Sequence, residues 1–272
     1  MSTTNISIAV CQLLLEGGEP DRNLDRARSM ILRAGNENCQ IALLPECMDL
    51  VWTHPSASTE AKPIPGRYSD YLCRTAAEAG IFVCAGLTED DGDKIYNSAV
   101  LINPAGKIML KYRKINVLEV GQKFYAIGNM LSVAETPHGV IGVNICSDNY
   151  ADALDIGRTL GRMGAQLILS PSSWTVDHSV SEEDEPYGEK WIRPFHTLAK
   201  EFNLAIISAT GVGYIVGGPY EGKKMVGCSL AVGPSGIISQ AGFNEFSSEF
   251  SIVEIEIPQN LPLGTAIGNR LK

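Results

Sequence analysis

The chain lacks several features that mark particular classes of protein. No apolar run in its 272 residues approaches the roughly 18 to 20 residues needed to cross a bilayer. No basic segment precedes the first apolar run, so a secretory leader is not expected. Positive charge is scarce, with 22 lysines and arginines against 31 acidic residues and a formal net charge of −9. This balance disfavours nucleic acid or an anionic membrane as a partner, and we expect a cytoplasmic protein that binds a small molecule.

Paired cysteines are also missing. Seven cysteines are scattered through the chain, with no Cys-x-x-Cys motif and no Cys/His grouping of the kind that binds zinc. A disulfide framework and a metal site are therefore not expected. Most of these cysteines lie in apolar runs, where a free cysteine behaves as a small buried hydrophobe. Cys146 differs, because it ends the apolar run "VIGVNIC" and is followed directly by the polar residues "SDN".

Apolar runs typical of strands alternate with amphipathic helical patterns. Strands are predicted at 6–15, 40–46, 81–89, 139–146, 166–173, 204–213 and 250–258, and helices at 19–35, 66–80, 152–165 and 189–203. The segments 97–114 and 228–242 contain Pro-Ala-Gly and Pro-Ser-Gly turns and are predicted hairpins. The two halves of the chain share this order of helix, strand and hairpin. The repeat predicts an α/β fold with two sheets packed face to face and helices outside, in a single domain over residues 1–272.

Cys146 is a candidate nucleophile. A strand that ends at Cys146 and passes through a polar turn to a helix near Asp152 places the sulfur at the carboxyl edge of a sheet, where active sites are frequent. Backbone N–H groups in such a turn favour a thiolate and donate hydrogen bonds to a developing oxyanion. The alternative, which is the commoner role of an isolated cysteine, is packing at the end of a strand.

Two charged residues also end strand-like runs. Glu46 follows a proline at the end of "IALLPE", where a buried carboxylate can serve as a general base, although a solvated loop residue is an equal alternative. Lys114 ends the aromatic and basic segment "LKYRK", which on its own is typical of a solvated edge strand. A single catalytic site containing Glu46, Lys114 and Cys146 explains all three positions together.

Several blocks of the sequence resemble the carbon–nitrogen hydrolase (nitrilase) superfamily. They are "LLPE", "PIPG", "YNSAVLINPAGKIMLKYRK", "GVNICSDN", "GAQLILSPSSW" and "GCSLAVGPSG", and the resemblance runs from about residue 5 to about residue 257. It implies a four-layer α-β-β-α sandwich of two mixed sheets and a metal-free Glu-Lys-Cys triad that needs no cofactor. By position, Glu46 resembles the general base, Lys114 the cation that stabilises the oxyanion, and Cys146 the nucleophile. The backbone N–H of Ser147 completes the implied oxyanion hole.

The substrate-binding candidates include departures from this pattern. Many members of the superfamily carry a further glutamate eight positions after the lysine, but this chain has Gln122 there, and Glu119 is an alternative for the role. Glutamine forms hydrogen bonds but carries no charge. Asp148 and Asn149 are candidates for organising the nucleophile turn and contacting substrate. Trp174 is a candidate for shaping the acyl pocket, or else a loop aromatic that covers the core.

Three functions are consistent with these residues. The favoured one is thiol-dependent hydrolysis of a small amide or N-carbamoyl amine, with release of ammonia from a cysteine thioester; "CSD" at the nucleophile is closer to amidases than to nitrilases. The alternatives are nitrile hydrolysis and a non-catalytic member that binds a ligand or partner. The acidic segment 181–189 is either a solvated loop or a negative rim that attracts a cationic substrate.

The resemblance also implies a homo-oligomer, a dimer or a larger assembly. Residues 258–272, with Leu261 and Leu263, form an apolar and basic tail that is a candidate to reach across such an interface.

Overall fold

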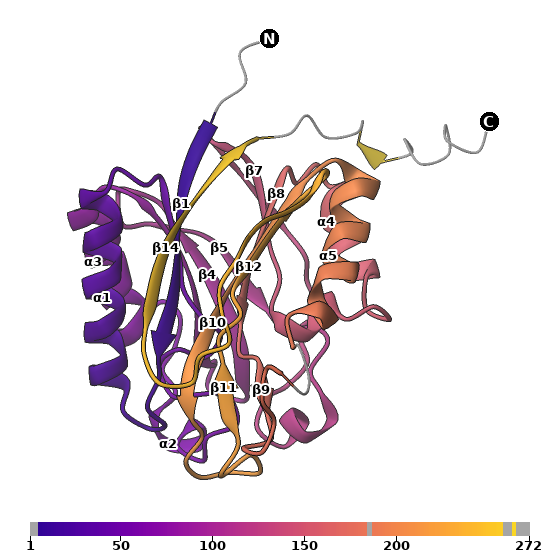
Figure 1. Ribbon diagram of the computed structural model, residues 1–272. Helices are drawn as coiled ribbons and strands as arrows, with labels where there is room; N and C mark the ends of the chain where they lie inside the picture. Colours follow the sequence, from indigo (N-terminus) through magenta and orange to yellow (C-terminus); the bar gives the residue numbers. More distant parts are fainter. Residues whose placement is uncertain (1–4, 184–186, 258–262, 265–272) are drawn as a thin grey trace.

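The computed structural model of the chain describes residues 5–183, 187–257 and 263–264 (Figure 1). One sheet contains, in spatial order, β14 (Glu249–Glu256), β1 (Asn5–Leu14), β2 (Ile41–Leu43), β3 (Phe82–Asp90), β4 (Ile95–Ile102) and β5 (Ile108–Arg113). The other contains β6 (Val133–Thr136), β7 (Gly139–Val143), β8 (Leu167–Ser172), β10 (Ala205–Tyr214), β12 (Leu230–Gly233) and β13 (Gly236–Gln240). The short strands β9 (Thr175–Val176) and β11 (Lys224–Val226) continue from the end of β10.

Both sheets are mixed. Each has a parallel centre, β1–β2–β3 in one and β7–β8–β10 in the other, and antiparallel strands on both sides of it. The last residues of β1 pair in parallel with β10, with Leu13 opposite Gly211 and Leu14 opposite Val212. Hydrogen bonding therefore continues from one sheet into the other at a single corner of the sandwich.

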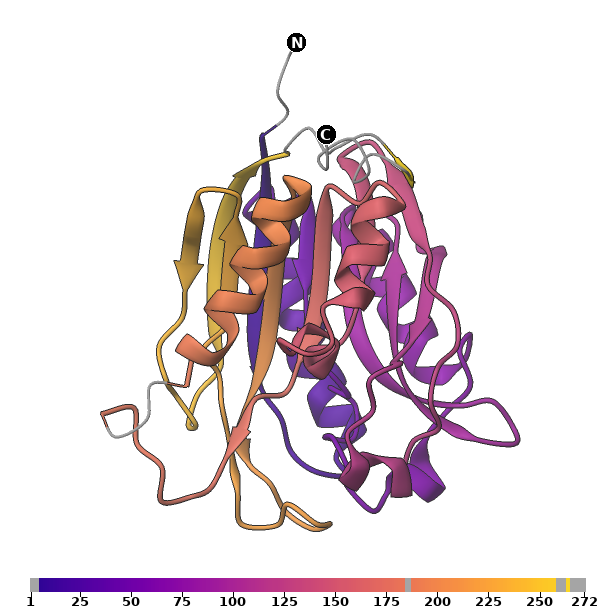
Figure 2. The same ribbon diagram turned by 90° about the vertical axis from the view of Figure 1, so that its right-hand side faces the viewer.

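Helices cover the outer faces of both sheets. α1 (Pro20–Asn36) and α3 (Arg67–Ala79) pack on the first sheet, and α4 (Asp155–Arg162) and α5 (Glu189–Phe202) pack on the second (Figure 1). Figure 2 shows α4 and α5 side by side across the outer face of the second sheet. α2 (Ala57–Glu60) and the 3-10 turns η1 (Glu119–Lys123) and η2 (Cys146–Asn149) lie in connecting loops. The predicted four-layer α-β-β-α sandwich is confirmed.

Strand β1 shows why the central strands read as unbroken apolar runs. Its residues Ile8 and Val10 belong to the core between the two sheets, whereas Ala9 and Cys11 belong to the core beneath α1 and α3. Side chains alternate between the faces of a strand, so a strand that is covered on both faces needs apolar residues at every position.

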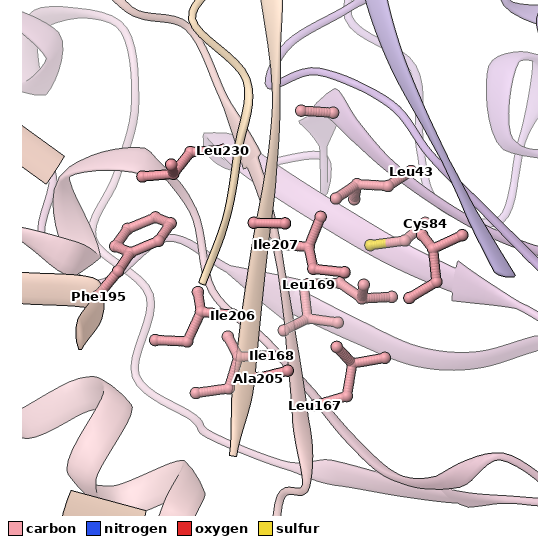
Figure 3. Close-up of a cluster of buried hydrophobic side chains, with 14 of the residues drawn as sticks. Leu43, Cys84, Leu167, Ile168, Leu169, Phe195, Ala205, Ile206, Ile207 and Leu230 are labelled. Atoms are coloured by element: carbon pink, nitrogen blue, oxygen red, sulfur yellow. The ribbon is translucent and has the colours of Figure 1, made fainter. Parts of the chain in front are cut away.

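The core between the sheets is formed by aliphatic side chains from both of them. Leu169 of β8 and Ile207 of β10 point toward Leu43 and Cys84 of the first sheet (Figure 3). Phe195 of α5 lies on the opposite face of the second sheet (Figure 3). Because all of these side chains are buried, the sheets and helices form a rigid support for the loops at their ends.

The tail 258–272, which was expected to reach an oligomer interface, lies mostly outside the described residues. Of the tail 258–272, only residues 263 and 264 are described, and Leu263 is exposed. The tail interface and the homo-oligomer stay predictions. In the part of the chain that is described, no helix is long and apolar enough to cross a bilayer.

Candidate active site

Glu46 lies in a tight turn after β2, with its residue only 1% exposed. The turn packs directly on Gly86 of β3, whose N–H donates to the Pro45 carbonyl (3.0 Å) and whose carbonyl accepts from the Met48 N–H (3.0 Å). A Cβ at position 86 would lie 2.5 Å from the Cα of Glu46, so only glycine permits this approach. The glycine in β3 thus determines where the carboxylate lies.

Lys114 follows the last residue of β5 and is 2% exposed. Its Nζ donates to Oε1 of Glu46 at 2.6 Å, and its backbone N–H donates to the carbonyl of Asn97 at 2.8 Å. Burial disfavours the charged form of the amine, but the charge of Glu46 and the hydrogen bond to it, together with the acidic groups of Cys146 and Asp148, outweigh burial and raise the pKa of Lys114 above its usual value. The side chain is therefore a buried ammonium paired with a carboxylate.

Cys146 begins the 3-10 turn η2 at φ +45°, in the left-handed region that non-glycine residues rarely adopt. Its Sγ lies 4.0 Å from the carbonyl oxygen of Ser173. Burial, reinforced by the negative charge of Glu46, raises the pKa of Cys146 to about 12. This differs from the thiolate expected from the sequence, because desolvation outweighs the favourable polar groups of the turn, and the predicted nearby helix begins at Asp155 instead of Asp152. The sulfur is a thiol at neutral pH and needs a base.

Asp148 holds the nucleophile turn in place through its side-chain carboxylate. Its Oδ2 accepts hydrogen bonds from the Ile145 N–H and the Tyr112 hydroxyl, each at 2.8 Å, and its Oδ1 accepts from the Asn116 N–H at 2.8 Å. Burial raises the pKa of Asp148 above its usual value. Asp148 is not among the residues that line the cavity described below, and its three hydrogen bonds support the turn.

Ser147 and Asn149 are held in the same way. The Ser147 hydroxyl donates to the Asn116 carbonyl at 2.7 Å, and the Asn116 side chain donates back to the Ser147 carbonyl at 2.5 Å. Asn149 donates to Asn144 at 3.1 Å and to Ser170 at 2.8 Å. The peptide that follows the nucleophile is therefore fixed on both sides. The Ser147 N–H lies in the first turn of η2, where helical amides have no partner within the helix.

Glu46, Lys114 and Cys146 line one cavity of about 180 Å³. Aromatic side chains form most of the rest of the wall. Besides the three residues just named, the cavity is lined by Trp52, Leu118, Tyr150, Ser173, Thr175, Tyr187, Lys190, Trp191 and Tyr220. The Lys190 ammonium lies 4.7 Å from the ring centre of Tyr150 and 5.5 Å from that of Tyr187, within cation–π range. Loops from both halves of the sandwich thus enclose a small aromatic chamber with a thiol, a carboxylate and an ammonium.

None of the five predicted substrate-binding residues lines this chamber, and two of them, Asp148 and Asn149, lie in the nucleophile turn η2. Gln122 is exposed and its side-chain amide donates to the Val117 carbonyl at 3.1 Å, and Glu119 is also exposed. Trp174 is buried and stacks on Trp191, with ring centres 4.7 Å apart and planes 5° from parallel. Trp174 therefore supports the cavity wall from behind.

The sequence analysis missed several residues of the site. Asn97, Trp52, Lys190, Trp191 and Tyr220 received no role, although all of them contact or line the cavity or its carboxylate. A signal existed only for Asn97, because an asparagine inside an apolar strand is unusual. Among the described residues, no group of three or more His, Cys, Asp or Glu side chains is placed to hold a metal ion.

Comparison with known proteins agrees with this architecture. A family model described as carbon-nitrogen hydrolase matches residues 7–259. The chain is 30% identical over 258 residues to a protein named nitrilase from Pyrococcus abyssi, covering 93% of this chain and 90% of the relative. It is 29% identical over 180 residues to a protein named omega-amidase NIT2 from Danio rerio, covering 62% of this chain and 64% of that relative. The chain belongs to the carbon–nitrogen hydrolase family.

Solved structures show the same fold. A carbon-nitrogen hydrolase from Helicobacter pylori superposes with a TM-score of 0.83 at 18% identity, covering 93% of this chain and 90% of that one. An amidase from Nesterenkonia sp. superposes with a TM-score of 0.76 at 20% identity, covering 95% and 92% of the two chains. At these identities the likeness concerns the fold, and the chemistry has to be argued from the residues of this chain.

Proposed function

We propose that this enzyme hydrolyses a small amide or N-carbamoyl amine through a thioester on Cys146, with release of ammonia. The observation that carries the proposal is the grouping of Glu46, Lys114 and Cys146 on one cavity of about 180 Å³. A thiol with a raised pKa needs a general base beside it, and a buried ammonium is suited to stabilise an oxyanion. The cavity supplies both.

In the first half of the reaction, Glu46 accepts the thiol proton while the sulfur attacks the carbonyl carbon. A C–S bond forms, and the carbonyl oxygen becomes an oxyanion that accepts hydrogen bonds from Lys114 Nζ and the Ser147 N–H. Glu46 then gives its proton to the amide nitrogen, the C–N bond breaks and ammonia leaves. Each oxyanion donor contributes about 10²- to 10³-fold to the rate in sites of this kind.

In the second half, Glu46 removes a proton from water, which attacks the thioester carbon. The same two donors stabilise the second oxyanion. The C–S bond then breaks, the sulfur regains a proton from Glu46, and the carboxylic acid product departs. Atoms balance with water as the only co-reactant.

The size and charge of the cavity favour a short, anionic acyl group. Its volume of about 180 Å³ lies below the range of roughly 300 to 1,000 Å³ usual for drug-sized ligands. Glu46 and Lys114 form an ion pair, and Lys190, the other charged residue that lines the cavity, makes no ion pair with any residue that the structure describes. Of the acidic segment 181–189, residues 184–186 lie outside the described residues, and Glu182, Glu183 and Glu189 are exposed and do not line the cavity. An amide whose acyl chain ends in a carboxylate fits these features best.

Nitrile hydrolysis is the second candidate, because the Pyrococcus abyssi relative is named a nitrilase. Ammonia release and intact mass, followed with panels of small amides, carbamoyl amines and nitriles, distinguish the two. We expect ammonia from amides, a transient acyl adduct on the wild-type protein, and neither in Cys146→Ala. Ammonia from nitriles alone would select the second candidate. No turnover and no adduct with any panel would indicate a non-catalytic member of the family, which binds a ligand or partner but does not hydrolyse it.

Replacing Lys190 with methionine tests the preference for an anionic acyl group. Losing one charge-assisted contact is expected to raise KM for carboxylate-bearing amides by about 10-fold, while KM for uncharged amides of the same length stays nearly constant. Lys200→Met is a matched control, because Lys200 is also an exposed lysine of α5 but does not line the cavity. An equal change for charged and uncharged amides would contradict the role given to Lys190.

A further inference from the structure

The contacts of Asn97 single it out within the site. Asn97 lies in β4, is fully buried, and donates from Nδ2 to Oε1 of Glu46 at 2.6 Å. Its backbone carbonyl accepts the N–H of Lys114 at 2.8 Å. One residue thus touches both members of the ion pair, the carboxylate through its side chain and the lysine through its main chain.

The orientation of the Asn97 amide is determined by chemistry. A carboxylate oxygen only accepts hydrogen bonds, so the group 2.6 Å from Glu46 Oε1 has to be the NH₂ end of the amide. Its Oδ1 is buried and has no hydrogen-bond partner among the residues that the structure describes. Leaving a buried amide oxygen unpaired is unfavourable. The side chain is therefore placed for its contact with Glu46 and not for its own hydrogen bonding.

The contact with Asn97 also gives the two oxygens of the Glu46 carboxylate different roles. Oε1 of Glu46 receives both Asn97 Nδ2 and Lys114 Nζ, each at 2.6 Å. Within the described part of the chain no N–H group donates to Oε2, and the Cys146 side chain is in hydrogen-bonding contact with Glu46. Two donors on one oxygen fix the plane of the carboxylate and leave the second oxygen for the thiol proton of Cys146, whose pKa the charge of Glu46 helps to raise.

We propose that Asn97 is a positioning residue that orients the Glu46 carboxylate, so that Oε2 is ready to accept the proton of Cys146. This inference rests on the roles proposed for Glu46 and Cys146. Asn97 does not line the cavity, so it acts through Glu46 and not by touching substrate. A donor to a carboxylate favours its charged form, and removing the donor makes the carboxylate hold a proton at higher pH.

The test uses alkylation of Cys146 by iodoacetamide, followed by peptide mass spectrometry as a function of pH, because it needs no substrate. The alkylation rate is expected to rise with pH as the general base loses its proton. In Asn97→Ala, the midpoint of this rise is expected to move up by about one pH unit, which corresponds to the free energy of about one charge-assisted hydrogen bond. In the isosteric Asn97→Asp, two carboxyl groups share a site and the midpoint moves further. Asn103→Ala is the matched control, since Asn103 caps the turn of the same hairpin far from Glu46.

The outcomes separate positioning from general support of the fold. Midpoints in the order wild type, Asn97→Ala, Asn97→Asp, with the control unchanged, support the proposal. Lower thermal stability with an unchanged midpoint in either Asn97 variant would overturn it, and Asn97→Asp alone suffices if Asn97→Ala does not fold. If the midpoints shift in this order but the wild-type protein turns over no amide, the proposed function fails while the role of Asn97 stands.

Discussion

Lys114→Met is expected to abolish turnover and to lower the free energy of unfolding by about 3 to 5 kcal/mol, as for other buried ion pairs that lose one partner. Methionine fills much of the space of the lysine stem, so the main change is the loss of charge. Glu46, 1% exposed, would lose one of the two donors to its Oε1 and keep the other, Asn97. Turnover falls by at least about 100-fold because an oxyanion donor is lost as well. Chemical denaturation and ammonia release measure the two effects.

The double variant Glu46→Gln/Lys114→Met separates the charge effect from packing. With both charges removed, no buried ion is left uncompensated, and the free energy of unfolding is expected to return to within about 1 kcal/mol of wild type. Turnover stays absent, because the base and the cation are both gone. A single variant as stable as wild type, or a double variant as unstable as the single one, would show that the two side chains do not form a buried pair.

The segment "LKYRK" shows what the sequence could and could not predict. Residues two apart share a face of a strand, so Lys111 and Arg113 were predictable as one group and Lys114 as another. In the structure, Lys111 and Arg113 both bind the buried Glu89, at 2.6 and 2.7 Å, while Lys114 binds Glu46. The partners themselves lie more than twenty residues away in the sequence, and no local pattern identifies which carboxylate each cation meets.

The layers were predictable because they depend on periodicity and on the repeated order of elements, and both are local properties. The residues of the cavity wall were not predictable in this way. Trp52, Tyr150, Trp191 and Tyr220 come from four separate loops or elements and share no spacing. Counting eight residues from the lysine led to Gln122, but the chain there forms the 3-10 turn η1, which turns that side chain to solvent. Such outcomes depend on loop conformation, which composition and periodicity do not determine.

Gly86→Ala is expected to lower both stability and reactivity, because the added methyl group meets the backbone of the turn that carries Glu46. The new Cβ would lie 2.5 Å from Glu46 Cα and 2.8 Å from the Pro45 carbonyl oxygen, and both are backbone atoms that cannot rotate away. Either β3 or the Glu46 turn has to shift. Overpacking of this kind costs about 1 to 3 kcal/mol, and a displacement of about 1 Å at a catalytic group can lower the rate by 100-fold. Thermal unfolding and the rate of Cys146 alkylation measure the two effects.

Gly242→Ala is the matched control, because a Cβ there meets no atom within 4 Å and the backbone is not in the left-handed region. We expect wild-type stability and reactivity for that variant. If Gly86→Ala is less stable but keeps the wild-type alkylation rate, the backbone of β3 has shifted and the Glu46 turn has not. If reactivity falls while stability is kept, the turn has moved, and the position of Glu46 is then set by its contact with Gly86 more than by its hydrogen bonds to Lys114 and Asn97. Combining Gly86→Ala with Asn97→Ala distinguishes these cases, since losses that add indicate independent restraints on the carboxylate and losses that do not add indicate a shared one.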